Sequence, residues 1–288
     1  MEYFLHLAIL FSIFAILAIS LQLIVGYTGL LSVAHAGFYG IGAYIVALLL
    51  KNAGMNFFPA LLLGALGSML VAFLIGIVLS RFRDDYYALG SLGFGVIAFS
   101  ILLNWQELTR GPLGIPGIPR PELFGFEFSS NLSYLLLSFI LLGAVYAFSR
   151  FLTLSSFGRA LQAIREDEEA LSVFGYRTSW FKLAVFVIGA GMAGIAGGLF
   201  ASYITYIDPG SFNVTESIFI LSLIILGGLG SLRGAVVGAL VLILLPEALR
   251  FVGFTPDIAA QMRQVVYGVL LIVLMLYRPQ GLMGKYKL

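Results

Sequence analysis

The sequence contains no cysteine, and only 10% of its 288 residues are charged. The absence of cysteine excludes disulfide bonds, thiolate metal ligands and a cysteine nucleophile. The low charge content excludes an ordinary soluble domain, in which about 25% of residues are charged. The formal net charge of +2 is also too close to zero to indicate a protein that binds nucleic acid.

Sequence motifs for catalysis and nucleotide binding are missing as well. The chain has no His-Glu-x-x-His, no Gly-x-Ser-x-Gly, and no Gly-x-x-x-x-Gly-Lys followed by Ser or Thr. Its two histidines, His6 and His35, are the only candidates for an imidazole base or metal ligand. We therefore expect that the chain is not an enzyme, that it binds no metal or cofactor, and that any ATP it uses is hydrolysed by another chain.

Uncharged apolar runs extend over the whole sequence, and 60% of the residues are hydrophobic. The first run, residues 4–25, is long enough to span a bilayer core of about 30 Å at about 1.5 Å per residue. Later runs cover residues 32–50, 58–80, 88–103, 131–149, 183–207 and 217–232, followed by the less regular stretches 234–249 and 264–277. These runs predict an all-α, polytopic transmembrane helix bundle of about nine spans, with eight and ten as alternatives, in one domain over residues 1–288.

The distribution of Lys and Arg predicts the orientation of this bundle. With nine spans and an external N-terminus, eleven of the 16 basic residues fall on the cytoplasmic side and five fall outside. Positive charge is enriched in cytoplasmic connections, so we predict an external N-terminus and a cytoplasmic C-terminus. Residues 104–130 then form an external loop, in which four prolines prevent a regular helix. Residues 150–182 form a cytoplasmic loop.

The cytoplasmic loop is predicted to contain a helix. Ser155 or Ser156 is a suitable N-cap, and Gly175 is a suitable stop. The apolar residues between them fall on one face: Ala160, Leu161, Ile164 and Leu171. One interpretation is a solvated connector between two spans, because charge runs usually mark solvated faces. The other is a docking element for a cytoplasmic partner protein.

Two glycine-rich segments, residues 26–42 and 227–238, indicate where a transport path could lie. Dense glycine permits close backbone approach or a broken helix, and both are common beside transport sites. The equally weighted alternative is tight helix packing, with His35 hydrogen-bonded to a neighbour. The candidate path residues are His35, Gly37, Gly40, Gly227, Gly228 and Gly230.

Acidic residues are nearly absent from the predicted spans, which argues against transport driven by a coupled ion. Glu247 is the exception, with Arg250 three residues later. A pair at a helix end near the membrane interface is the favoured interpretation of these two residues, ahead of an ion-coupling site.

Four motifs then carry a family resemblance. They are GYTGLLSVAHAGFYGIGAY (Gly26 to Tyr44), FGRALQAIREDEEALSVFGY (Phe157 to Tyr176), GGLGSLRGAVVGA (Gly227 to Ala239) and RPQGLMG (Arg278 to Gly284). Together they resemble the permease subunits of branched-chain amino acid ABC importers, of the Liv M type. The motifs occur in the family's order and cover essentially the whole chain.

The resemblance implies a multi-pass permease of the inner membrane, surrounded by lipid and powered by other chains. Its implied partners are a second homologous permease, two cytoplasmic ATPases and an extracytoplasmic solute-binding protein. The residues that match the family's ATPase-coupling segment are Gly158, Arg159, Ala160, Arg165, Glu166, Asp167, Glu168, Ala170 and Gly175. Related permeases serve urea, short amides and other amino acids, so the solute stays open. The alternative function is a self-sufficient carrier or channel for a small polar solute such as urea.

Overall fold

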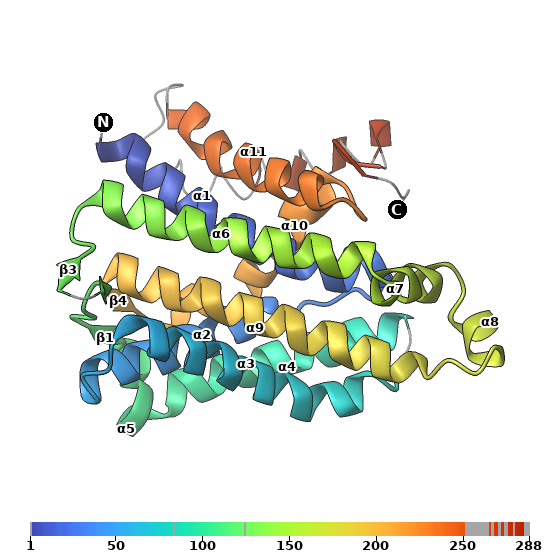
Figure 1. The fold of residues 1–288 in the computed structure, drawn as a ribbon, viewed down its shortest axis with the longest axis horizontal. Helices are drawn as coiled ribbons and strands as arrows, with labels where there is room; N and C mark the ends of the chain where they lie inside the picture. The colour runs from blue at the N-terminus through green and yellow to red at the C-terminus, as the bar shows by residue number, and fades with distance from the viewer. Residues whose placement is uncertain are drawn as a thin grey trace.

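The protein is an α-helical bundle, seen in a computed structural model that describes residues 2–82, 84–123, 125–250, 265, 268–269, 272–273, 276–278 and 280–284. Most of its long helices lie side by side along one direction (Figure 1). Half of the predicted stretch 264–277 and the side chains of Glu247 and Arg250 lie outside the described residues. The all-α membrane class predicted from the sequence is confirmed.

The long helices are α1 (Glu2–Leu21), which continues as the π-helix η1 (Gln22–Gly26), then α2 (His35–Asn52), α3 (Phe57–Leu79), α4 (Asp84–Asn104), α6 (Asn131–Leu154), α9 (Thr178–Ile204), α10 (Val214–Gly227) and α11 (Leu232–Arg250). The shorter elements are α5 (Gln106–Thr109), η2 (Gly111–Leu113), β1 (Ile115–Pro116), β2 (Glu122–Leu123), β3 (Phe126–Glu127), α7 (Ser156–Glu166), α8 (Glu168–Val173), β4 (Tyr206–Ile207) and η3 (Pro209–Phe212).

Helix α9 lies at the centre of the bundle and packs against α1, α2 and α3. Small residues allow these helices to approach closely. This is usual for helices in a membrane, where the hydrophobic effect does not drive helices together. A Cβ atom at Gly197 would lie 2.1 Å from the Tyr39 carbonyl oxygen, and one at Gly194 would lie 2.6 Å from Ser68 Oγ. The glycines of α9 therefore set the spacing between the central helix and its neighbours.

The two ends of the bundle carry different structures. At one end the N-terminus lies beside the start of α6, where Asn131 donates a hydrogen bond to Glu2 over 2.6 Å. Strand β1 pairs antiparallel with β4 at this end, with Ile115 opposite Ile207, and the prolines of the 104–130 loop confine its regular structure to short pieces. Helices α7 and α8 project beyond the other end (Figure 1). The predicted external and cytoplasmic loops thus lie at opposite ends, while the orientation itself stays a prediction.

Five helices among the described residues are long and apolar enough to cross a membrane, with a bent pair as a sixth candidate. Helix α2 is a further, largely buried helix of the bundle. One predicted span is wrong. The apolar run 217–232 is not a single helix, because α10 ends at Gly227, α11 begins at Leu232, and the two are bent by 118°. The predicted count of nine is not confirmed.

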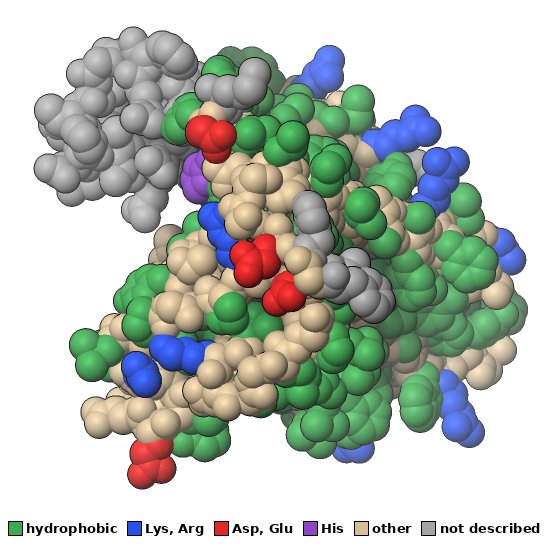
Figure 2. All heavy atoms as spheres, turned by 60° about the vertical axis from the view of Figure 1, so that its left-hand side comes forward, with side chains coloured by type: hydrophobic (Ala, Val, Ile, Leu, Met, Phe, Trp, Pro, Cys, Tyr) green, Lys and Arg blue, Asp and Glu red, His purple; other side chains and the backbone are tan. Residues whose placement is uncertain are grey.

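The flanks of the bundle are covered by hydrophobic side chains. Figure 2 shows these side chains next to the end face that carries the N-terminus, where backbone and charged groups come to the surface. Large apolar residues of α3, α4 and α6 are exposed along the flanks, among them Leu70, Leu89 and Ile140. This surface is suited to contact with lipid or with another membrane chain, because exposing so much apolar area to water is unfavourable.

Candidate functional site

The first glycine-rich segment contains a break between two helices. After η1 the backbone turns at Gly29, with φ at +76°, and residues 29–34 have no regular structure before α2 begins at His35. Buried backbone groups need partners when helical bonds are missing. One partner is Ser91 of α4, whose hydroxyl accepts a hydrogen bond from the Val33 amide over 3.0 Å. A broken helix, one of the arrangements that dense glycine permits, is present here.

His35 lies at the start of α2 and is fully buried, with 0% exposure. Its Nε2 atom lies 2.6 Å from Ser20 Oγ of α1. Two glycines of the same helix receive neighbouring side chains. A Cβ at Gly37 would meet Ala98 of α4 at 3.3 Å, and one at Gly40 would meet Phe212 at 2.9 Å. These three candidate path residues lie inside the helix packing, which favours their structural interpretation.

The second glycine-rich segment contains the bend between α10 and α11. Gly228 and Gly230 have φ angles of +105° and +75°, which a residue with a side chain rarely adopts. The end of α10 is capped by the last motif of the chain, because the amide of Leu282 donates to the Leu226 carbonyl over 3.0 Å. The amide of Met283 likewise donates to the Gly227 carbonyl over 2.9 Å. These bonds satisfy carbonyls that a helix end leaves unpaired.

The two breaks share neighbours on the first helix. Gln22 is fully buried, and its Nε2 atom donates to the carbonyl oxygens of Gly228 at 3.0 Å and Ser231 at 3.2 Å. Ser20, two residues earlier, bonds His35. A further bond joins the first turns of α2 and α10, where the Ala36 amide donates to Ser217 Oγ over 3.0 Å. The end of α1 therefore connects both groups of candidate path residues.

The predicted cytoplasmic helix is two helices. Ser155 caps α7, as predicted, by accepting from the Gly158 amide over 3.5 Å. Continuity as far as Gly175 was wrong, because Asp167 adopts an extended backbone and its carboxylate caps α8 by accepting from the Ala170 amide over 2.9 Å. Gly175 follows α8 with φ at +85°, in line with its predicted role as a stop.

Helices α7 and α8 differ in how many of their side chains are buried. Three of the four predicted stripe residues, Ala160, Leu161 and Ile164, are buried in α7. All six residues of α8 are at least partly exposed, and Val173 and the following Phe174 are 85% and 80% exposed. Helix α7 is thus anchored to the bundle, whereas α8 presents apolar side chains to its surroundings.

The predicted coupling residues divide into two groups. Some face inward: Gly158 lies against the backbone of α6, Ala160 is buried, Arg165 donates to the Gly26 carbonyl of η1, and Glu168 binds Lys182. The others lie exposed on the projection, and they are Arg159, Glu166, Asp167, Ala170 and Gly175.

Lys182 is the functional candidate that the sequence reasoning missed. It is 2% exposed, and its Nζ atom lies 2.9 Å from Glu168 Oε1 and 3.2 Å from the Phe82 carbonyl oxygen. Thr178 also donates to Glu168 over 2.8 Å. A buried lysine requires such partners, because an unpaired charge is costly. The available signal was a lone lysine at the head of a long apolar run, downstream of an acidic cluster.

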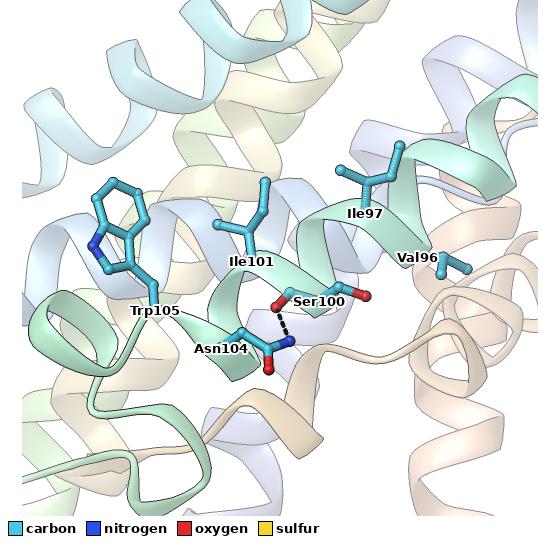
Figure 3. Close-up of a pocket in the computed structure, with 6 residues that line it drawn as sticks. All are labelled: Val96, Ile97, Ser100, Ile101, Asn104 and Trp105. Atoms are coloured by element: carbon cyan, nitrogen blue, oxygen red, sulfur yellow. Dashed lines mark hydrogen bonds between the residues drawn. The ribbon is translucent and has the colours of Figure 1, made fainter.

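The outward face of α4 carries a shallow hollow of about 430 Å³. Its lining residues are Val96, Ile97, Ser100, Ile101, Asn104 and Trp105. Figure 3 shows Ile97, Ile101 and Trp105 on one side of the helix and Ser100 with Asn104 on the adjacent side. Asn104 Nδ2 donates to the Ser100 carbonyl over 2.8 Å. Polar side chains on an outward membrane face are unusual, since hydrocarbon offers them no hydrogen bonds.

Metal-binding geometry is not found in the part of the chain that the structure describes, where no three His, Cys, Asp or Glu side chains are grouped to hold an ion. The expectation that no metal or cofactor binds stays a prediction.

A bundle of membrane-crossing helices with two interconnected breaks and a helical projection at one end has the architecture of a membrane transport protein. The chain belongs to the family described as branched-chain amino acid transport system, permease component, whose model matches residues 3–275. It is a multi-pass protein of the inner membrane.

Individual relatives agree with this family. The chain is 36% identical to the high-affinity branched-chain amino acid transport system permease protein LivM of Salmonella typhimurium, over 94% of this chain and 68% of the relative. The LivM protein of Escherichia coli is also 36% identical, over 96% and 69%. The LivH permease protein of Salmonella typhimurium is 28% identical over 95% and 92%. No solved structure matches the chain. The comparisons support the permease over the urea alternative.

Proposed function

We propose that the chain, as one domain over residues 1–288, is a permease subunit that moves branched-chain amino acids across the inner membrane. Energy comes from separate cytoplasmic ATPases, because the chain has no nucleotide-binding motif of its own. The observation that carries this proposal is the α7–α8 projection, which is anchored through one helix and exposed through the other. Relatives named as transport permeases support the solute class.

The ATPase-docking surface is assigned to Val173, Phe174, Tyr176 and the exposed acids Glu166 and Asp167. Exposed aromatic side chains next to charged groups are typical of a protein interface, where a few aromatic anchors supply most of the binding energy. A solvated connector would not require three large apolar residues in contact with water. Of the predicted coupling residues, the exposed group is assigned to ATPase contact and the inward-facing group to holding the projection.

The other partners are assigned by position. The outward face of α4 lies against the second permease subunit, because a partner or a polar path along it would accommodate Ser100 and Asn104. The solute-binding protein approaches the opposite end of the bundle, at the 104–130 loop. The chain itself catalyses no reaction.

Co-purification and uptake test the proposal. The tagged chain is co-expressed with its candidate ATPases, second permease and binding protein, and uptake of labelled leucine is measured in proteoliposomes. Phe174→Ala is expected to reduce ATPase co-purification at least about tenfold, the effect of losing one interface anchor. Phe4→Ala is the matched control, because Phe4 is similarly exposed at the opposite end.

Three results would contradict the proposal. If the ATPases bind the Phe174→Ala variant as strongly as they bind the wild type, the assignment of the docking surface is wrong. Uptake of urea without ATP by the chain alone would favour the self-sufficient channel. ATP-driven uptake of another solute, with leucine excluded, would retain the permease and replace its substrate.

A further inference from the structure

Arg165 of α7 reaches into the bundle. Its guanidinium donates a hydrogen bond to the carbonyl oxygen of Gly26, the last residue of η1. The methylene part of the side chain lies over the first break, where a Cβ at Gly29 would meet Arg165 Cγ at 3.1 Å. Helix α7 is therefore joined to the end of the first transmembrane helix by a charged hydrogen bond and by close contact at a glycine.

Gln22 continues this connection on the other side of Gly26. A Cβ at Gly26 would lie 2.6 Å from Gln22 Cδ, so the amide side chain covers the glycine. Gln22 in turn donates to the carbonyl oxygens of Gly228 and Ser231, at the bend between α10 and α11. Arg165, Gly26, Gln22 and Gly228 thus form one contiguous series of contacts from the cytoplasmic projection to the bend.

The segment that contains both contacts is a π-helix. A π-helical turn inside an α-helix is rare and occurs mostly at functional sites, because its wider turn is less stable than the regular helix. The bend at the other end of the series contains two glycines with positive φ, and residues 228–231 are not helical. Hinges in membrane and soluble proteins use such short non-helical positions to absorb changes in backbone angle.

We propose that Arg165 and Gln22 are positioning residues that transmit displacement of α7 to the α10–α11 bend. The proposal rests on the function proposed above, since the displacement comes from an ATPase bound at the projection. When α7 moves, the Arg165 bond pulls on the Gly26 carbonyl, and Gln22 carries that shift to Gly228 and Ser231. Arg165 therefore acts within the chain rather than as a docking contact for the ATPase.

The experiment compares Arg165→Ala, Gln22→Ala and the double variant in the reconstituted transporter. Arg150→Ala is the matched control, because Arg150 lies exposed near the same end of the bundle, in α6, and outside the surface assigned to the ATPase. Three quantities are measured: ATPase co-purification, ATP hydrolysis, and solute taken up per ATP hydrolysed. The last of these distinguishes transmission from stability.

Each single variant is expected to keep ATPase co-purification at the wild-type level and to lower uptake per ATP by about 2- to 30-fold, the range found for residues within a coupling network. The double variant is expected to have the same uptake per ATP as the single variant with the lower value, because both residues belong to one series of contacts. Arg165→Lys, which retains a cationic donor, is expected to recover part of the ratio.

Uptake per ATP equal to that of Arg150→Ala would overturn the proposal, as would losses that add in the double variant. A purely structural role would lower the yield of folded complex and leave the ratio of the remaining complex unchanged, which also counts against transmission. A wild-type chain that binds no ATPase would overturn the proposed function itself, and that result is distinguishable because it requires no variant.

Discussion

The two glycine-rich segments look alike in sequence but are used differently. In the first segment the chain breaks at residues 29–34, before most of the glycines, which then lie within α2. There they mainly receive side chains: Gly37 faces Ala98 and Phe94, and Gly40 faces Phe212 and Leu102. Gly42 is the exception, because a Cβ there would lie 2.3 Å from the Cα of Gly194.

In the second segment the break falls at the glycines, and the close contacts are between backbones. A Cβ at Gly227 would lie 2.0 Å from the Gly234 carbonyl oxygen, and one at Gly238 would lie 1.9 Å from the Leu223 carbonyl oxygen. Side chains can rotate away from an added methyl group, whereas packed backbones cannot. Glycine density alone therefore does not predict how sensitive a position is to substitution. The prediction depends on whether the neighbouring atoms belong to a side chain or to the backbone.

The largest effect is expected for Gly238→Ala. The methyl group would overlap the backbone of α10, so α10 and α11 must separate, at a cost of about 3 kcal/mol. Thermal denaturation of the detergent-solubilised protein measures this loss. Gly143→Ala is the control, because a Cβ at Gly143 meets nothing within 4 Å. Equal melting temperatures for Gly238→Ala and the control would contradict the role assigned to backbone contact.

Gly42→Ala is expected to be intermediate and to behave like the second segment, although it lies in the first. Its neighbour is the backbone of α9, so the expected destabilisation is about 1–3 kcal/mol. The same melting measurement applies. If this variant were as stable as Gly37→Ala, backbone contact would not be the deciding property.

Gly37→Ala is expected to have the smallest effect. The added methyl group would lie 3.3 Å from Ala98 Cβ, which requires a slight shift of α4. Alanine also favours the helix over glycine by about 1 kcal/mol, so the net change in stability is expected within about 1 kcal/mol of zero. Because α4 carries the hollow, uptake is the sharper measurement, and unchanged melting with altered uptake would support Gly37 as a transport-path residue over its structural interpretation.

Local signals in the sequence predicted much of this structure. The apolar runs predicted the helical membrane class, and Ser155 and Gly175 predicted the start and the end of the projection. The glycine density indicated a broken helix or close packing, and both occur. Each of these features depends on residues close together in the chain. The motifs also identified the family before any three-dimensional arrangement was known.

Features that depend on distant partners were not predictable. Asp167 was placed inside one helix because the N-cap and the stop were read as the two ends of a single helix, but its carboxylate caps a second helix instead. Arg165 was assigned to ATPase coupling through the family resemblance of its segment. Its contact is Gly26, 139 residues earlier, and no local pattern indicates that distance.

Lys182 has a consequence for how the protein is made. Membrane insertion of α9 would be opposed by the charge of Lys182, although by less than the cost of about 3 kcal/mol that applies at the centre of a span, because Lys182 lies in the second turn of the helix. Synthesis runs from the N-terminus, so Phe82 and Glu168 both emerge before Lys182 and are available when it arrives. The hydrogen-bond acceptors of Lys182 are therefore synthesised before Lys182 itself. Loss of Glu168 is therefore expected to reduce the amount of protein inserted, at a stage before any ATPase could bind.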